Sequence, residues 1–322
     1  MKDPFDIKVN SIPALYKRFP NEKACIKHLE NIYWHGEPVS PFDRTSKVYK
    51  LKNGKYRCKN TGKNFTAKTN TMFEKTKVSL QKWFIAIWLV VNHKASISSY
   101  QLAKDIEVTQ KTAWFMLHKI RSQMYLINEN PLSEEVEIDE TLVGGRNKNR
   151  HWNKKVAHSQ GRSHKDKTPV VGMIQRENLM NAKVTQDTTA KTLSALIRQF
   201  IDPDSILFTD ENSAYDSIGR SYTRYSVDHS KNFYGWGYIT SNRIEGAWTH
   251  FKRMILGAYR NVISKKYLQK YVDEFVFRYN LRDNDASGMF NCFLCCSDGR
   301  ITHKEIKARL WIELTENKKS LY

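Results

Sequence analysis

Apolar positions follow helical spacing between residues 79 and 125 of the chain. Residues 79–93 and 110–124 carry apolar side chains three and four positions apart, and a shorter helical segment at 96–106 lies between them. Thr109 directly precedes the second long segment, where its hydroxyl can cap the helix. A short helix, a tight turn and a longer basic helix in this order predict a helix-turn-helix.

Strands and helices alternate in the middle of the chain. The pattern predicts three successive strands, a helix, a strand, a short connection, a strand and a helix, at 135–145, 168–177, 179–186, 188–201, 205–210, 222–229 and 241–255. This is the element order of a ribonuclease H-like domain. We therefore predict an α/β fold with a mixed sheet and flanking helices, followed by an amphipathic helix at 264–284.

The first 70 residues show little helical periodicity. Residues 47–60 alternate around Asn53-Gly54, which is a strong signal for a two-residue turn, so a β-hairpin is expected there. The longest apolar run, residues 84–91, is too short to cross a bilayer. Five cysteines and no secretion signal indicate free thiols in a reducing compartment.

The charge points to a polyanionic partner. The formal net charge is +20 and the pI is about 9.6, which favours nucleic acid. An anionic membrane surface is the alternative, but the charge is spread along the chain and not gathered on one amphipathic helix. Residues 146–167 form a basic insertion with eight Lys or Arg and one Asp. This insertion is expected to contact DNA, or else to be a solvated hairpin.

Three carboxylates occupy positions that the predicted fold would bring together. Asp139 lies in the first strand, Asp210 ends the fourth strand, and Glu245 lies on the helix that follows. On that helix Asn242, Glu245 and Lys252 fall on one polar stripe. Clustered carboxylates repel each other and favour a hard divalent cation, which can promote phosphodiester displacement.

Basic side chains near these acids would hold the phosphate backbone. We expect them on the outward side of the third helix and in the basic insertion. The candidates are Lys111, Lys119, Arg146, Lys148, Arg150, Lys154 and Lys155. On the third helix, Ala113, Leu117 and Ile120 should face inward instead.

Four segments, VEIDETLVGG, ILFTDENSAYDS, NRIEGAWTHFKRMILGAYR and LQKYVDEFVFRYNLR, carry a family resemblance. Together they resemble the DDE-type transposases of bacterial insertion sequences, in the group with an N-terminal zinc ribbon, a helix-turn-helix and an ISXO2-like catalytic domain. The resemblance covers residues from about 12 to 310. It implies Mg²⁺, with Mn²⁺ able to substitute, cleavage of the element's terminal inverted repeats, and transfer of the released 3′-hydroxyl to target DNA.

The resemblance also implies residue roles. Asp139 and Asp210 would be the first and second acids, and Glu245 the third, although some members have Asn in that role, which here is Asn242. Lys252 would contact a phosphate near the cleavage point, and His229 would approach the scissile group or be structural. DNA would be the partner of a homo-oligomer in the bacterial cytoplasm, associated with the nucleoid, with no membrane involved.

The resemblance also implies how the chain divides into regions. They are a degenerate zinc-ribbon-like region (1–70), a helix-turn-helix region (71–130), a ribonuclease H-like catalytic domain (131–260) containing the insertion 146–167, and a helical C-terminal region (261–322). The ribbon departs from the family, because Ser40, Asp43 and Thr61 stand beside Cys58 where four thiolates are expected. No zinc is expected there, and Cys292-x-x-Cys295 is interpreted as part of a helix.

Two other functions fit the same residues. One is a DNA-binding protein derived from a transposase that has lost catalysis, which the missing ribbon thiolates favour and the retained acids oppose. The other is a different ribonuclease H-like nuclease, acting for example on RNA–DNA hybrids or branched DNA. A strand-nicking assay separates the first from an active transposase, and a panel of substrates separates the second.

Overall fold

The chain forms two compact units, each with its own core of buried apolar side chains. Unit 1 comprises residues 1–124 and 283–322, and unit 2 comprises residues 125–282. The computed structural model describes residues 7–125, 131–145, 147, 151–157, 167–176, 179–227, 241–259, 263–297, 299–302 and 305–306. Within these ranges, no helix is both long enough and apolar enough to cross a membrane.

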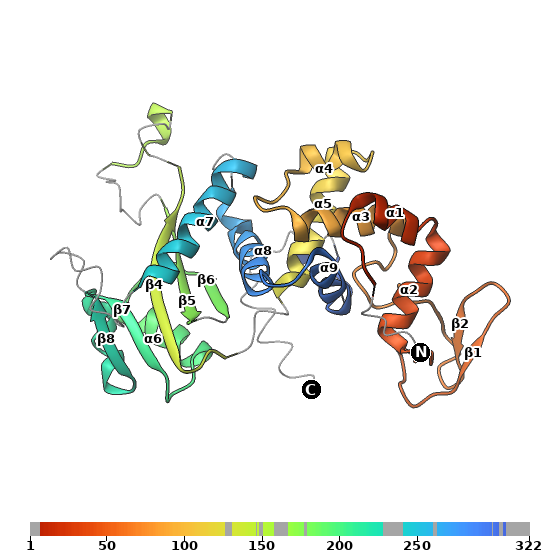
Figure 1. The fold of residues 1–322 in the computed structure, drawn as a ribbon, viewed down its shortest axis with the longest axis horizontal. Helices are drawn as coiled ribbons and strands as arrows, with labels where there is room; N and C mark the ends of the chain where they lie inside the picture. The colour runs from red at the N-terminus through yellow and green to blue at the C-terminus, as the bar shows by residue number, and fades with distance from the viewer. Residues whose placement is uncertain are drawn as a thin grey trace. The chain divides into compact units, whose positions relative to one another are not determined.

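Unit 1 is mainly helical and carries one small sheet (Figure 1). Its elements are α1 (Ile12–Arg18), α2 (Glu22–Trp34), β1 (Val48–Lys50), β2 (Tyr56–Cys58), β3 (Asn64–Phe65), α3 (Leu80–Asn92), α4 (Ser99–Asp105), α5 (Gln110–Met124) and α9 (Ala286–Cys295). The first two helices were not predicted, although each begins at a polar cap, Ser11 or Asn21, whose side chain accepts a backbone amide. Cys292 and Cys295 lie on α9, as expected.

The three helices predicted between residues 79 and 125 are present as α3, α4 and α5. The Thr109 hydroxyl accepts a 3.2 Å hydrogen bond from the Thr112 backbone amide, so the predicted cap is confirmed. Ala113, Leu117 and Ile120 are buried, which confirms the inward face of α5.

The predicted hairpin is present, but its turn is longer than expected. The Leu51 amide donates to the Lys55 carbonyl over 2.8 Å, so the loop has three residues, 52–54. Of the Asn53-Gly54 pair, Gly54 alone takes a positive φ, +76°, as a three-residue hairpin loop requires. The hairpin pairs with the short strand β3 to complete an antiparallel three-stranded sheet.

Unit 2 is a five-stranded mixed sheet with helices on both faces (Figure 1). Its elements are β4 (Glu135–Val143), η3 (Trp152–Lys154), β5 (Thr168–Gln175), β6 (Met180–Val184), α6 (Ala190–Phe200), β7 (Ile206–Asp210), η4 (Ser213–Tyr215), η5 (Ile218–Arg220), β8 (Thr223–Val227), α7 (Asn242–Tyr259), η7 (Lys265–Tyr267) and α8 (Leu268–Asn280). All the strands and helices predicted for this part of the chain are present.

The order of strands across the sheet is β6-β5-β4-β7-β8. The first three strands in sequence form an antiparallel meander, and β7 and β8 run parallel to β4. This is the ribonuclease H-like topology that the element order predicted. It places β4 in the centre, with β7 directly beside it.

Two cores cover the two faces of this sheet. Side chains of α7 and α8 pack with Val170 and Ile174 on one face, whereas α6, η4 and η5 pack with Val136 and Ile138 on the other. The region 261–322, predicted as one C-terminal part, is divided: α8 lies in unit 2 and α9 in unit 1.

Candidate active site

Three carboxylates gather where β4 and β7 lie side by side. Asp139, Glu140 and Asp210 each offer an oxygen, and these oxygens lie within 4.8 Å of one another. Two of the three were predicted to meet, and Glu140 was not part of the predicted site. Several carboxylate oxygens at this separation can hold a hard divalent cation.

The pairing of β4 with β7 explains why these acids meet. The parallel ladder ends with Val136 opposite Leu207 and Glu137 opposite Phe208. Two residues further along each strand the same alignment brings Asp139 beside Asp210. Both acids therefore lie just beyond the last pair of the β4–β7 ladder, while Asp139 still pairs with Gly172 of β5 and Asp210 with Val227 of β8.

Burial and mutual repulsion favour protons, or a cation, on these acids. The pKa of Asp139 is raised to about 6, chiefly by burial and also by the negative charges of Asp210 and Glu245, whereas the Glu140 backbone hydrogen bond and the Lys252 charge lower it. Burial, together with the charges of Asp210 and Asp139, likewise raises the pKa of Glu140 to about 7. A bound cation would relieve this repulsion.

The carboxylate of Glu140 is held from the other side by a tyrosine. The Tyr215 hydroxyl on η4 donates a 2.6 Å hydrogen bond to Glu140 Oε1, which lowers the pKa of that carboxyl and partly offsets its burial. Tyr215 itself is fully buried in the core on the α6 face. No local sequence pattern indicated this pair, because 75 positions separate the two residues.

An arginine on β8 fixes the chain around Asp210. Arg224 donates to the Asp210 carbonyl oxygen over 3.0 Å and to Thr209 Oγ1 over 2.8 Å. Its remaining guanidinium nitrogen donates to Asp216 over 2.7 Å. The end of β7 is therefore tied to β8 and to the turn that follows, which holds the Asp210 backbone in place.

Helix α7 starts on a buried carboxylate of β4. Glu137 is fully buried, and its Oε2 accepts the backbone amides of Arg243 and Ile244 over 3.0 and 3.1 Å. A carboxylate at this position accepts hydrogen bonds from amides that have no partner within the helix. Its negative charge is also stabilised by the positive end of the helix dipole. The Glu137 Oε1 atom accepts a 3.1 Å hydrogen bond from Arg176 Nε, so the buried charge is paired.

The predicted residues of α7 lie on its exposed side. Asn242, Glu245 and Lys252 are all exposed. The Glu245 carboxylate accepts from Ser241 Oγ over 3.3 Å and lies outside the group of three close carboxylates. Its charge and that of Lys252 nevertheless act on Asp139. The structure thus brings Asp139 and Asp210 together and leaves Glu245 nearby.

The predicted outward orientation of one lysine is wrong. Lys119 was expected to face outward, but its side chain is buried and its Nζ donates to the Met72 carbonyl over 2.7 Å. Desolvation lowers the pKa of Lys119 to about 8. Lys111 and Lys155 are exposed, as expected. Arg146, Lys148, Arg150, the Lys154 side chain and His229 lie outside the described residues.

The ribbon-like region does not offer the donors of a zinc site. Ser40 Oγ accepts the backbone amides of Phe42 and Asp43 over 3.2 and 3.4 Å, so a hydroxyl fills the position of a knuckle thiolate. Burial raises the pKa of the Cys58 thiol, but hydrogen bonds from Ser40, Ser46 and Thr61 outweigh it and bring the pKa to about 6. One sulfur among hydroxyls does not match a tetrahedral site of thiolates and imidazoles.

A ribonuclease H-like sheet with carboxylates clustered on its two adjacent central strands fits a DDE-type transposase. Residues 131–280 match the family model of the ISXO2-like transposase domain. The chain is 28% identical over 280 residues to a protein in the transposable element ISH50 of Halobacterium salinarum, covering 81% of this chain and 92% of that protein. It is also 32% identical over 99 residues to a transposase-like protein of Haemophilus influenzae, covering 30% of this chain and 77% of that protein. The chain belongs to the insertion-sequence transposases with an ISXO2-like domain.

Solved structures of Mos1 show a distant likeness. The Mos1 strand transfer complex matches with a TM-score of 0.30 and 12% identity, over 68% of this chain and 79% of that one. The Mos1 mariner paired end complex with Mn matches with a TM-score of 0.28 and 13% identity, over 73% of this chain and 86% of that one. The fold assignment therefore rests on the order of strands in the sheet.

Proposed function

We propose that this transposase binds the terminal inverted repeats of its insertion sequence and uses divalent cations to cleave and transfer DNA strands. The observation that carries the proposal is the meeting of Asp139 and Glu140, in the middle of β4, with Asp210 at the end of the adjacent strand β7. Mg²⁺ is the expected ion, with Mn²⁺ able to substitute, because both accept carboxylate oxygens.

The carboxylates have the right chemistry for the cation that such a reaction uses. A bound divalent cation supplies Lewis acidity, which favours attack on a phosphorus atom and stabilises the departing oxygen. Asp139 and Asp210 hold this charge from neighbouring strands, and Glu140 adds a third carboxylate. Cleavage by water releases a 3′-hydroxyl, and that hydroxyl then attacks a phosphate of the target DNA as the bond to the target's own 3′ oxygen breaks.

Helix α7 contributes the remaining predicted residues of the site. Glu245 approaches from the exposed side of the helix, where its charge already raises the pKa of Asp139. We assign Glu245 the role of third acid and not Asn242, because a carboxylate is the harder ligand. Lys252 contacts a DNA phosphate near the cleaved bond, and His229 is a further candidate beside the scissile group.

DNA is the proposed partner, because the chain carries a large positive net charge and the carboxylate site suits phosphodiester chemistry. Lys111 on α5 and Lys155 of the basic insertion are exposed and can contact phosphates. Arg146, Lys148, Arg150 and Lys154 carry the same proposed role. Two element ends must be joined, so we infer a homo-oligomer assembled on DNA.

A nicking assay tests this proposal. The purified protein is incubated with a duplex carrying the repeats that flank the gene, with Mg²⁺, with Mn²⁺, or with a chelator. We expect metal-dependent nicks with 3′-hydroxyl ends, lost in Asp139→Asn, Asp210→Asn and Glu245→Gln while DNA binding persists. Asp204→Asn changes an exposed acid of the same unit and should cleave like the wild type. Normal cleavage by Asp210→Asn would overturn the assignment, and binding without any cleavage would favour a DNA-binding derivative.

A further inference from the structure

The outward face of the small sheet in unit 1 carries an unusual concentration of positive charge. Residues 40–77 contain eleven Lys or Arg and two acids. In the register of β1 and β2, Tyr49 lies opposite Arg57, and the Lys59 amide donates to the Lys47 carbonyl over 2.9 Å. Because side chains alternate along a strand, Lys47, Tyr49, Arg57 and Lys59 share one face. All four are exposed.

The opposite face of the sheet is anchored to unit 1. Tyr56, Cys58 and Phe65 are buried and form a core with Trp34 of α2. The Trp34 ring meets the Tyr56 ring edge-on, with centroids 5.0 Å apart. This packing fixes which face of the sheet points to solvent.

The arrangement on the outward face is unfavourable without a partner. Lys47 and Lys59 lie directly opposite each other, and like charges in such a pair destabilise a sheet. In the described part of the chain no ion pair neutralises Lys47, Arg57 or Lys59. Asp43, the acid nearest in sequence, instead accepts hydrogen bonds from Asn60 and Thr45. A polyanion laid across this face would remove the repulsion.

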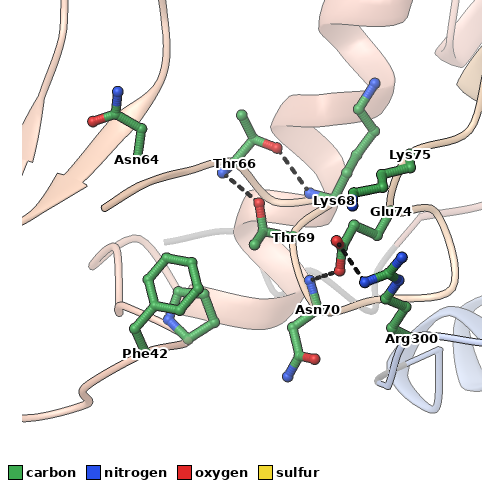
Figure 2. Close-up of a pocket in the computed structure, with 10 residues that line it drawn as sticks. Phe42, Asn64, Thr66, Lys68, Thr69, Asn70, Glu74, Lys75 and Arg300 are labelled. Carbon is green, nitrogen blue, oxygen red and sulfur yellow. Dashed lines mark hydrogen bonds and ion pairs between the residues drawn. The ribbon is translucent and has the colours of Figure 1, made fainter. Parts of the chain in front are cut away.

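A hollow of about 620 Å³ in the same unit is a weaker candidate for an anion, although Lys68 and Arg300 line it (Figure 2). Two of the three cations that line it already face carboxylates: Arg300 lies 3.6 Å from Glu74, and Lys68 lies 3.3 Å from Glu22; Lys75 is the third. Figure 2 shows the Glu74 carboxylate joined to Arg300 and to the Asn70 backbone. Most of the positive charge in the hollow is therefore already in ion pairs, whereas the cations on the sheet face are not.

An aromatic side chain adds to the charged face. Tyr49 is 44% exposed, and the Lys47 ammonium lies 5.9 Å from the centre of its ring. Lysines and arginines interleaved with an exposed tyrosine can contact phosphates and sugars together. On the exposed face of an antiparallel sheet they form a surface that suits the backbone of a duplex.

We propose that the outward face of β1–β2, with Lys47, Tyr49, Arg57 and Lys59, is a DNA-contacting surface that grips the phosphate backbone of double-stranded DNA. It is separate from α5, since the strands and α4–α5 lie at different ends of unit 1 (Figure 1). The inference rests on the proposed function and extends the DNA contact beyond the predicted helix and insertion. It also means that the ribbon region serves DNA binding without a zinc site.

The test compares two triple variants of the full chain. Lys47→Gln/Arg57→Gln/Lys59→Gln removes three charges from the sheet, and Lys17→Gln/Lys23→Gln/Lys27→Gln removes three exposed charges from α1 and α2 of the same unit. Affinity for a random-sequence duplex of about 30 base pairs is measured across a salt series. Each lost phosphate contact lowers the slope of log affinity against log salt by about 0.9, so the sheet variant should lose about 2 to 3 in slope and roughly tenfold or more in affinity.

The control variant should keep its slope within about one contact of the wild type. Equal losses in both variants, or none in the sheet variant, would overturn the proposal, as would a changed oligomeric state with an unchanged slope. Lysine acetylation of the wild type gives a second readout that needs no variant: duplex DNA should protect Lys47 and Lys59 and leave Lys23 and Lys27 reactive. Metal-dependent nicking by the wild type reports on the proposed function independently of either result.

Discussion

The hydroxyl of Tyr215 donates a 2.6 Å hydrogen bond to Oε1 of Glu140, and so joins the core on the α6 face to the carboxylates of β4. Glu140 keeps one oxygen in the group that can hold a cation. The tyrosine thus orients a carboxylate in the way that outer hydrogen-bond partners orient metal ligands.

Tyr215→Phe should therefore weaken metal binding without unfolding the protein. Loss of an orienting partner costs about 10- to 100-fold in metal affinity, and we expect the lower end because Asp139 and Asp210 remain. Isothermal titration with Mn²⁺ measures the change. Tyr222→Phe is the matched control, since Tyr222 is also buried and donates over 3.1 Å to the Ile201 carbonyl, outside the acid cluster. Equal affinity in the two variants would contradict the role of Tyr215.

Metal affinity should rise with pH between about 6 and 8. The pKa of Asp139 is about 6 and that of Glu140 about 7, so protons compete with the cation increasingly as pH falls through 7 and 6. We expect affinity on the order of tenfold lower at pH 6 than at pH 8, with proton release near pH 6.5 visible in buffers of different ionisation enthalpy. A flat profile would show that neither carboxyl binds the ion.

The same shifts have a defined sign for stability. Both folded-state pKa values lie above the ordinary values of 3.8 and 4.5, so the folded, metal-free protein holds these protons longer than the unfolded chain does. These two groups therefore lower the free energy of unfolding as pH rises from about 4 to about 7. Asp139→Asn should raise the melting temperature of the metal-free protein at pH 8 and abolish the further rise on adding Mg²⁺. A lower melting temperature in this variant would contradict the repulsion.

Gly172 decides how closely α7 approaches the sheet. It lies opposite Asp139 in the β4–β5 register, and a Cβ atom there would come within 2.5 Å of the Trp248 ring. Gly172→Ala should cost about 1–3 kcal/mol of stability and reduce nicking, because the displaced helix carries Glu245. Gly257→Ala, on the open side of α7, should instead be stabilising by up to about 1 kcal/mol. Thermal unfolding and nicking of both variants provide the comparison, and a neutral Gly172→Ala would contradict it.

Lys119 and Lys111 lie on the same helix and should behave differently. Lys119→Gln removes the buried donor to the Met72 carbonyl and should cost about 1–3 kcal/mol of stability, with an unchanged salt slope of DNA binding. Lys111→Gln should leave stability unchanged and lower the salt slope by about one contact. If the Lys119→Gln protein is stable but loses a DNA contact, Lys119 faces outward and binds DNA, which would contradict its buried position.

The sequence predicts much of unit 2 because its patterns are local. Alternation of apolar residues marks β4, and the position of Asp210 at the end of a short apolar strand marks β7. The order of elements then places Asp139 beside Asp210 before any contact is known. Helix α7 was likewise predicted, since its apolar stripe of Ile244, Trp248 and others repeats at helical spacing.

What was missed depends on contacts between distant residues. Glu140 and Tyr215 are 75 positions apart in the sequence. Glu137 and Arg243, whose amide it caps at the start of α7, are 106 positions apart. Lys119 sits at a position that helical spacing alone would leave exposed. Its burial arises because the segment around Met72 folds over α5 and accepts its ammonium group. Such pairings leave no periodic signal in the chain.

The most direct test of the central claim is a Mn²⁺ titration of the metal-free protein, followed by electron paramagnetic resonance of the free ion. The wild type and the Asp204→Asn control should show the same saturable binding. Asp139→Asn and Asp210→Asn should lose most of it. Equal binding by all four proteins would show that the carboxylates of β4 and β7 do not form the metal site.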